Sequence, residues 1–326
     1  MEEHRRGRRI RRHAHQPAPQ RRWRPGAPEG QAARPSGLPA HALLMSASSA
    51  EETAKAGEPA QDSPVAAPVS AVGTAFIARF TPAVSFLGEV LLAAGAAIRG
   101  RWRYRREDMA RVLTDVSAKA VPIVLVVNFL VGAILAFVGS VQLVKFGAGI
   151  FVADLVSIAI AREMAAVITA VVMSGRTGAA FAAELAAMQA HEEIDALAVL
   201  GIAPISYLVL PRVLALLLMM PLLYVYGCVA GLMGGLVVSA AMLDLGPAVY
   251  LDRTFLALTP PHLLLGVTKA VVFGALVALA GCFYGLRARR DAAGVGIATT
   301  RAVVAGIVGV IAIDAVFAVC ANALDI

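Results

Sequence analysis

The chain has 326 residues, of which 59% are hydrophobic and 16% charged, and a formal net charge of +7 at pH 7. Soluble domains average about 45–50% apolar and about 25% charged residues, so this composition excludes an ordinary soluble globular protein. It also argues against a nucleic-acid-binding groove, because the arginines lie mainly in the first 34 residues and in short clusters beside apolar segments. That distribution is typical of the cytoplasmic flanks of membrane spans.

The first segment, residues 1–72, is rich in Arg, Pro, Ala, Ser and Gln and shows no apolar periodicity. Such a composition cannot bury enough apolar surface to fold, so we predict a disordered basic tail. No apolar stretch follows its arginines, which argues against a signal peptide. Met45 offers an alternative start to the chain.

A membrane domain is predicted from residue 73 to residue 326. Its first apolar segment, 75–98, is interrupted by Arg79, Pro82 and Glu89 and is followed by a basic run. These interruptions favour a helix that lies in the membrane interface over one that crosses the membrane.

Five later apolar segments are each long enough to cross a bilayer, which takes about 20 residues as an α-helix. The third carries glycines at spacings that let neighbouring helices approach closely. We therefore predict an all-α integral membrane protein with an N-terminal interfacial helix and five transmembrane helices. The predicted spans cover residues 120–144, 152–183, 213–243, 262–286 and 300–324.

The charges flanking these spans predict their orientation. With the N-terminus inside, the Arg-rich head, the 184–212 connection and the loop around 287–301 all lie in the cytoplasm, and most Arg and Lys residues outside the spans belong to them. This agrees with the positive-inside rule. Five spans then place the C-terminus on the outer, periplasmic side.

Four ionisable residues lie deep within the predicted spans, away from their ends, and are the candidates: Arg162, Glu163, Lys269 and Asp314. A charge inside a bilayer is costly, so such residues are candidate functional groups. All four lie at a similar depth, roughly 7–11 residues from the outer ends of their spans, which is about 11–17 Å. We predict that Lys269 pairs with Asp314 and that Arg162 and Glu163 border a polar cavity. The alternative is that both pairs only fix the register of the helices.

A polar helix is predicted at residues 184–201, between the second and third spans. Apolar residues at helical spacing, including Met188 and Leu197, alternate with the acidic residues Glu184, Glu192, Glu193 and Asp195. Gly201 is a plausible C-cap, and Pro204 prevents immediate continuation. Such an amphipathic helix either docks into a groove of a soluble partner or merely joins two spans.

Nucleotide, metal and catalytic motifs are missing from this sequence. It contains no G-x-x-x-x-G-K-[ST], no GxSxG and no HExxH, and its three cysteines lie singly within apolar runs. We therefore predict no catalytic residues, no metal site and no cofactor in this chain, and any ATP would be bound by a separate protein.

From about Thr114 to the C-terminus the chain resembles the MlaE (YrbE) family of ABC transporter permeases. Three blocks carry the resemblance: REMAAVITAVVMSGRTGAAFAAELAAM, then EEIDALAVLGIAP through LVLPRVLA, and VTKAVVFGALVALAGCFYGLRARRDAAGVGIATTRAVV. The chain departs from the family at Met164-Ala165-Ala166, where Gly-Pro usually follows Arg-Glu-Leu, and at Ala186, where glycine is usual.

This resemblance implies a homodimeric permease in a bacterial inner membrane. It implies a cytoplasmic ATPase, an MCE-domain lipid-binding protein and a small STAS-type protein as partners, and a lipid as substrate. It makes 184–201 the coupling helix that docks on the ATPase, and it places Arg162 and Glu163 beside the lipid cavity. The expected function is ATP-driven movement of phospholipid or a related apolar lipid. The alternative is an ion- or proton-coupled carrier that uses Lys269 and Asp314 as a relay.

Overall fold

The computed structural model describes residues 67–99, 106–243 and 245–323, and within these ranges it is helical, with no strand. The predicted tail lies outside the described residues, except that 67–72 already belong to the first helix. In a bilayer every backbone amide must find its partner within the protein, and an α-helix achieves this within one segment. The predicted all-α membrane fold is confirmed.

Six described segments are long and apolar enough to cross a membrane. Five of them correspond to the predicted spans, and the sixth, Thr81–Ile98, is part of helix α2 (Ala67–Ile98). α2 begins eight residues before the predicted interfacial helix and continues through Pro82. The location of α2 in the membrane interface stays a prediction.

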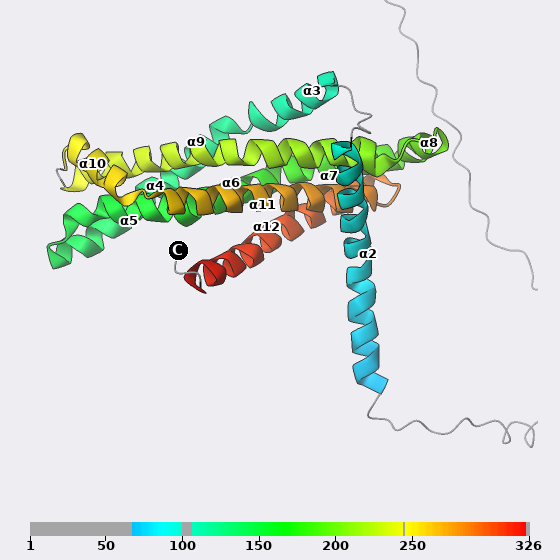
Figure 1. The fold of residues 1–326 in the computed structure, drawn as a ribbon, viewed down its shortest axis with the longest axis horizontal. Coiled ribbons are helices and arrows are strands. Elements are labelled where there is room, and N and C mark those ends of the chain that lie inside the picture. Colours follow the sequence, from blue (N-terminus) through cyan, green and yellow to red (C-terminus); the bar gives the residue numbers. More distant parts are fainter. Residues whose placement is uncertain (1–66, 100–105, 244, 324–326) are drawn as a thin grey trace, which may run out of the picture. The chain divides into compact units, whose positions relative to one another are not determined.

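The longer helices that follow α2 lie alongside one another in a bundle (Figure 1). α9, α11 and α12 start three, two and eight residues earlier than the predicted spans, because apolar patterning does not locate the ends of helices. The helices are α3 (Arg106–Ser117), α4 (Val121–Leu143), α5 (Val152–Ala159), α6 (Ala165–Met173), α7 (Ala179–Ala190), α8 (Glu193–Val199), α9 (Leu210–Leu243), α10 (Pro247–Ala257), α11 (Pro260–Leu286) and α12 (Ala292–Ala323).

Two helices were not predicted from the sequence. α3 precedes the first span, and α10 occupies the predicted outer loop between α9 and α11. Proline opens α10 at Pro247, directly after Gly246, and two prolines open α11. Proline suits the first turn of a helix because its missing N–H would have no partner there.

Three short π-helical turns connect helices of this set: η3 (Ile160–Met164), η4 (Ser174–Gly178) and η5 (Ile205–Val209). The predicted second span is therefore α5, α6 and α7 joined through η3 and η4. π-turns in helices occur frequently at functional sites. The turn η3 forms without a proline, because Ala165 and Ala166 follow Met164.

Close contact between α4 and α9 depends on glycines of the third predicted span, as expected, and also on Gly132 of α4. A Cβ atom on Gly234 would collide with the backbone of Phe129, and one on Gly132 would collide with the backbone of Gly231. In lipid, small residues that let backbones approach are the main packing device. These glycines thus explain why α4 lies along α9.

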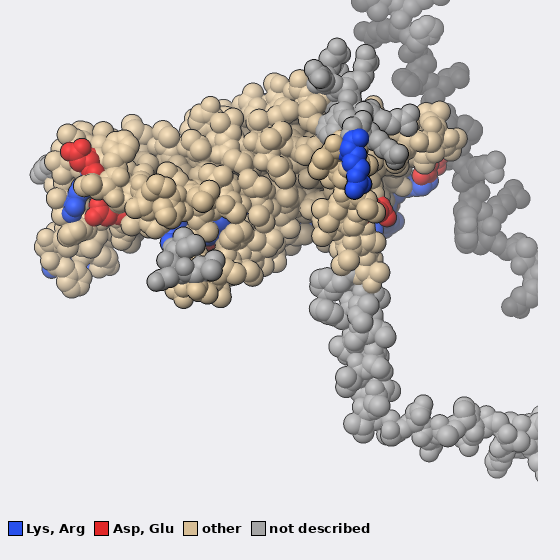
Figure 2. Space-filling view, viewed as in Figure 1, with Lys and Arg blue, Asp and Glu red and all other residues tan. Residues whose placement is uncertain are grey.

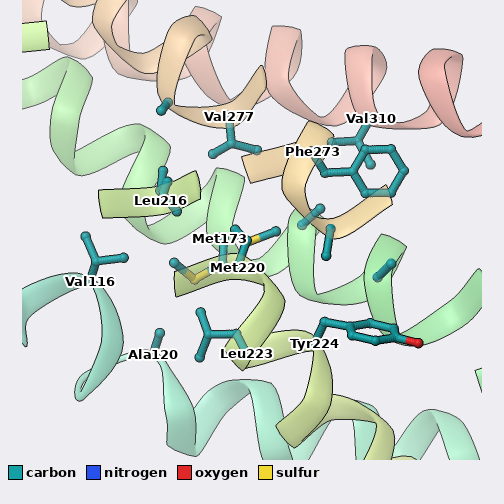
Figure 3. Close-up of a cluster of buried hydrophobic side chains, with 14 of the residues drawn as sticks. Val116, Ala120, Met173, Leu216, Met220, Leu223, Tyr224, Phe273, Val277 and Val310 are labelled. Atoms are coloured by element: carbon teal, nitrogen blue, oxygen red, sulfur yellow. The ribbon is translucent and has the colours of Figure 1, made fainter. Parts of the chain in front are cut away.

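Figure 3 shows the part of the buried core to which α3, α6, α9, α11 and α12 contribute. Its larger side chains come from all five helices and interdigitate, with the Tyr224 hydroxyl at the edge of the cluster. Representative members are Val116, Met173, Leu216, Met220, Leu223, Tyr224, Phe273, Val277 and Val310. This core sets the distances between α6, α11 and α12, which carry or adjoin the ionisable residues.

Charged side chains on the visible face gather mainly at the two ends of the bundle, and the surface between them is mostly uncharged (Figure 2). α8 lies at one end and α10 at the other (Figure 1). An uncharged band between two charged rims is what a protein in a bilayer requires.

Candidate functional site

The four intramembrane ionisable residues come together as one cluster. Lys269 on α11 is fully buried, and its Nζ lies 2.9 Å from Oδ1 of Asp314 on α12. The same Nζ donates a hydrogen bond to Oε2 of Glu163 in the π-turn η3. Arg162 Nε lies 3.7 Å from Oε1 of Glu163. Lys269 therefore bridges the carboxylates of Glu163 and Asp314, whereas the sequence suggested that Lys269–Asp314 and Arg162–Glu163 form two separate pairs.

The cluster contains two positive and two negative groups, so its formal charge is zero. A lone charge buried in the apolar interior would be strongly destabilising, while a paired and hydrogen-bonded set is tolerated. The side chains of Arg162, Glu163 and Asp314 are 23%, 26% and 25% exposed, respectively, on the surface of the single chain. The cluster is thus closed on the Lys269 side and open on the other.

The π-turn η3 directs Glu163 toward Lys269. The Tyr224 hydroxyl on α9 donates a hydrogen bond to the Ala161 carbonyl in this turn, at 2.6 Å. A buried carbonyl that accepts such a bond holds the turn against α9. No pattern in the sequence distinguishes Tyr224 from other aromatic residues in apolar spans, so its role was not predicted.

Gly266 lets α11 approach the same turn. A Cβ atom at this position would collide with the Tyr224 hydroxyl and the Ala161 carbonyl. Lys269 follows three residues later, on the same face of the helix as Gly266. The close approach at Gly266 therefore brings Lys269 within reach of Glu163.

A second buried polar contact joins α4, α6 and α9. Asn128 Nδ2 donates to the Val124 carbonyl at 2.9 Å and to Thr169 Oγ1 at 3.3 Å. Both side chains are fully buried, and Gly227 on α9 lies against them. This contact fixes the register of three helices.

The predicted coupling helix, residues 184–201, is not one helix. Glu184 and Met188 lie in α7, and the chain turns at His191 and Glu192 before α8 begins at Glu193. Glu192 adopts a left-handed conformation, with φ of 60°, which ends α7. The prediction of a continuous helix was wrong because the apolar pattern continues across a turn that only the backbone geometry reveals.

Salt bridges tie this elbow, residues 184–201, to its neighbours. Arg212 Nη2 lies 3.0 Å from Glu184 Oε2. Arg290, in the loop between α11 and α12, lies 2.6 Å from Asp195 and 3.5 Å from Glu192. Glu193 has an exposed side chain. The sequence did offer a signal for this role of Arg290, because the acidic 184–201 segment and the basic loop around 287–301 were predicted to lie on the same side of the membrane.

The apolar residues of the elbow divide into two groups. Met188 and Leu197 are partly buried and pack against the core, and Ile194 is buried. Val199 and Leu200, at the end of α8, are 89% and 73% exposed. The elbow thus presents an apolar tip flanked by acidic side chains.

Residues 109–320 match the sequence profile of the family described as Permease MlaE. The chain belongs to this family. Among curated relatives, a probable ABC transporter permease protein of Rickettsia conorii is 39% identical over 60% of this chain and 75% of its own length. One from Synechocystis is 35% identical over 64% of this chain and 79% of its own.

A plant relative also matches. The chloroplastic protein Trigalactosyldiacylglycerol 1 of Arabidopsis thaliana is 32% identical over 65% of this chain and 60% of its own length. As an MlaE-family permease, the chain is a multi-pass membrane protein and a transmembrane transporter subunit. All four residues of the charge cluster and the elbow lie inside the matched region.

Proposed function

We propose that the chain is the permease subunit of an ABC transporter that moves phospholipid or a related apolar lipid between a bacterial inner membrane and a periplasmic MCE-domain carrier. The observation that carries the proposal is the match of residues 109–320 to MlaE permeases. The name of the Arabidopsis relative contains that of a glycerolipid, which supports a lipid as the cargo.

ATP is hydrolysed by a separate cytoplasmic ATPase that docks on the elbow, so this chain itself needs no cofactor. Exposed apolar residues flanked by charges are suited to a groove on a protein partner. Val199 and Leu200 supply the apolar anchor, and Glu193 is an exposed acidic neighbour.

The end of the bundle that carries α8 faces the cytoplasm. Arg212, Arg287, Arg289 and Arg290 lie at or near the helix ends there, as the positive-inside rule asks of a cytoplasmic rim. The N-terminus is then inside, and α12 carries the C-terminus to the periplasmic side. α10 lies on that side and presents the exposed side chains of Phe255 and Leu256, an apolar surface suited to the carrier.

The working unit is a homodimer in which the second copy closes the open side of the charge cluster. Only 11% of the α12 span is buried within one chain, compared with 50% of the span containing α9. The partly exposed Arg162, Glu163 and Asp314 would line the resulting lipid cavity. A small STAS-type protein completes the set of proposed partners.

Movement passes from the ATPase to the cavity through Arg290. Asp195 and Glu192 hold Arg290, and the next residue, Asp291, caps the start of α12 by accepting a hydrogen bond from the Gly294 N–H at 2.7 Å. α12 then runs without interruption to Asp314, about 34 Å along its axis. A displaced elbow therefore moves a carboxylate of the cluster.

Copurification and lipid transfer together test this proposal. The full chain is expressed with its ATPase, and Leu200→Asp is compared with Leu256→Asp, a residue of nearly the same exposure on α10. We expect Leu200→Asp to lose the ATPase and Leu256→Asp to retain it. The purified complex should transfer lipid to the carrier only with ATP. Transfer by the permease without the ATPase would favour an ion-coupled carrier instead.

A further inference from the structure

A cavity of about 390 Å³ lies far from the charge cluster, where α2 meets the end of α11 and the start of α12. α2 contributes Pro82, and the remaining lining comes from the end of α11, the loop and α12. Three of the lining residues are arginines: Arg287, Arg289 and Arg301.

Two of these three charges face no carboxylate in the described part of the chain. Arg289 pairs with Asp291 at 3.0 Å. Arg287 instead donates to the Pro82 carbonyl at 3.1 Å, and its guanidinium lies 4.1 Å from the centre of the Phe283 ring. Arg301 is exposed, with neither an ion pair nor a hydrogen bond among the described residues. The cavity therefore carries uncompensated positive charge.

An apolar groove of about 320 Å³ continues from this cavity. Both are lined by Tyr284 and Arg301, and the groove also follows Val304, Ala305 and Val308 of α12. Val304 and Val308 are one turn apart, so the groove runs along the helix toward the middle of the span. A charged mouth with an apolar extension fits a molecule that has an anionic head and a hydrocarbon chain.

We propose that the cavity and groove form one binding site for an anionic phospholipid of the cytoplasmic leaflet, separate from the transport cavity. The phosphate would lie between Arg287 and Arg301, because a guanidinium fork matches phosphate oxygens. One acyl chain would follow the groove along α12. Basic pockets at the cytoplasmic ends of membrane helices bind such headgroups.

The chemistry of the site favours this occupant. A second copy of the chain would bring its own Arg287 and Arg301 toward the same symmetric contact, and like charges would repel. Free phosphate would leave the groove unfilled. A lipid bound here would connect α2 to α11 and α12, in addition to the contact of the Phe86 and Phe283 rings, whose centres are 5.5 Å apart.

Native mass spectrometry of the full chain, purified in detergent with whatever partners remain bound, measures this site directly. Added phosphatidylglycerol should be retained more strongly than phosphatidylcholine. One arginine near a phosphate contributes about 1 kcal/mol, so Arg287→Gln and Arg301→Gln should each lower phosphatidylglycerol retention about fivefold. Arg290→Gln, the same change in a neighbouring arginine outside the cavity, should not lower it.

Two further variants separate the parts of the site. Arg301→Lys keeps the charge and should retain most of the binding, which shows that Arg301→Gln did not simply misfold the chain. Ala305→Phe fills the groove and should weaken phosphatidylglycerol retention, with the protein still folded by size-exclusion chromatography. Inorganic phosphate at millimolar concentration should not displace the lipid.

Three outcomes would overturn the proposal: equal retention of the two lipids, an equal loss in Arg290→Gln, or full displacement by inorganic phosphate. The inference rests on the proposed orientation, which places this end at the cytoplasmic leaflet. The measurement needs neither ATP nor lipid transfer, so a failure of the transport function and a failure of this site would be told apart.

Discussion

The Tyr224 hydroxyl donates a hydrogen bond to the Ala161 carbonyl across 2.6 Å, and the next two residues after Ala161 are the Arg162 and Glu163 of the charge cluster. A tyrosine on one span thus supports the irregular turn of another. Because the turn directs Glu163 toward Lys269, the geometry of the cluster depends on a residue that carries no charge.

Tyr224→Phe should destabilise the protein without changing the shape of the core. The substitution leaves the buried Ala161 carbonyl without its partner, which costs about 1–3 kcal/mol. Thermal unfolding in detergent would show this as a lowered midpoint. Tyr226→Phe, two residues along the same helix and 42% exposed, is the matched control and should shift the midpoint little. Equal shifts would mean that the hydrogen bond does not support the turn.

Gly266→Ala should separate α11 from the π-turn. Its new Cβ atom would meet backbone and hydroxyl oxygens that cannot move freely, and such overpacking costs about 1–3 kcal/mol. Gly296→Ala makes the same change in α12, where no atom lies within 4 Å of the new Cβ. An alanine in an open helical position should be neutral or stabilising by up to about 1 kcal/mol. The thermal midpoint should therefore fall in Gly266→Ala and stay the same or rise in Gly296→Ala, and a harmless Gly266→Ala would contradict the close approach.

Lys269→Met should be more harmful than its combination with Asp314→Asn. The single change leaves the partly buried Asp314 without its cation, and breaking such a pair costs at most about 3–5 kcal/mol. The double change leaves only Arg162 and Glu163, which neutralise one another. The amount of folded protein extracted from membranes, measured by fluorescence-detected size exclusion, should fall in the single variant and largely recover in the double.

A simple exchange of Lys269 and Asp314 should recover less. The exchange restores an ion pair between positions 269 and 314. It also places an aspartate at position 269, where its carboxylate is repelled by that of Glu163. Full recovery by the exchange would show that Glu163 does not belong to the cluster.

Arg290→Ala should uncouple transport from ATP hydrolysis while it leaves folding intact. Its ion pairs are exposed and contribute at most about 1 kcal/mol to stability, so the thermal midpoint should barely change. The ATPase should still copurify, but less lipid should be transferred for each ATP hydrolysed. Arg289→Ala removes a neighbouring arginine that is more exposed and has no ion pair with the elbow among the described residues, and lipid transfer for each ATP hydrolysed should stay unchanged. If Arg290→Ala transfers as much lipid for each ATP hydrolysed as the unchanged protein, the movement of the ATPase reaches the cavity by a path that does not include Arg290.

The amino-acid sequence by itself determined that this is an all-α membrane protein, and it determined where the costly charges lie. The reason is that a bilayer provides no partner for backbone amides, so a long apolar segment has to be helical wherever it packs. The same reasoning from desolvation marked Arg162, Glu163, Lys269 and Asp314 before any contact was known.

Tertiary structure alone decided how those residues meet. The helices are apolar on nearly all sides, so their periodicity does not show which face of α11 turns toward η3, and Glu163 could not be assigned to Lys269 from the sequence. The break at Glu192 and the contact between Arg290 and Asp195 are likewise set by backbone geometry and by which helices become neighbours. Packing against the surrounding helices selects both the break and the contact. The residues that determine this packing are distributed over the whole core, so no local sequence pattern reveals them.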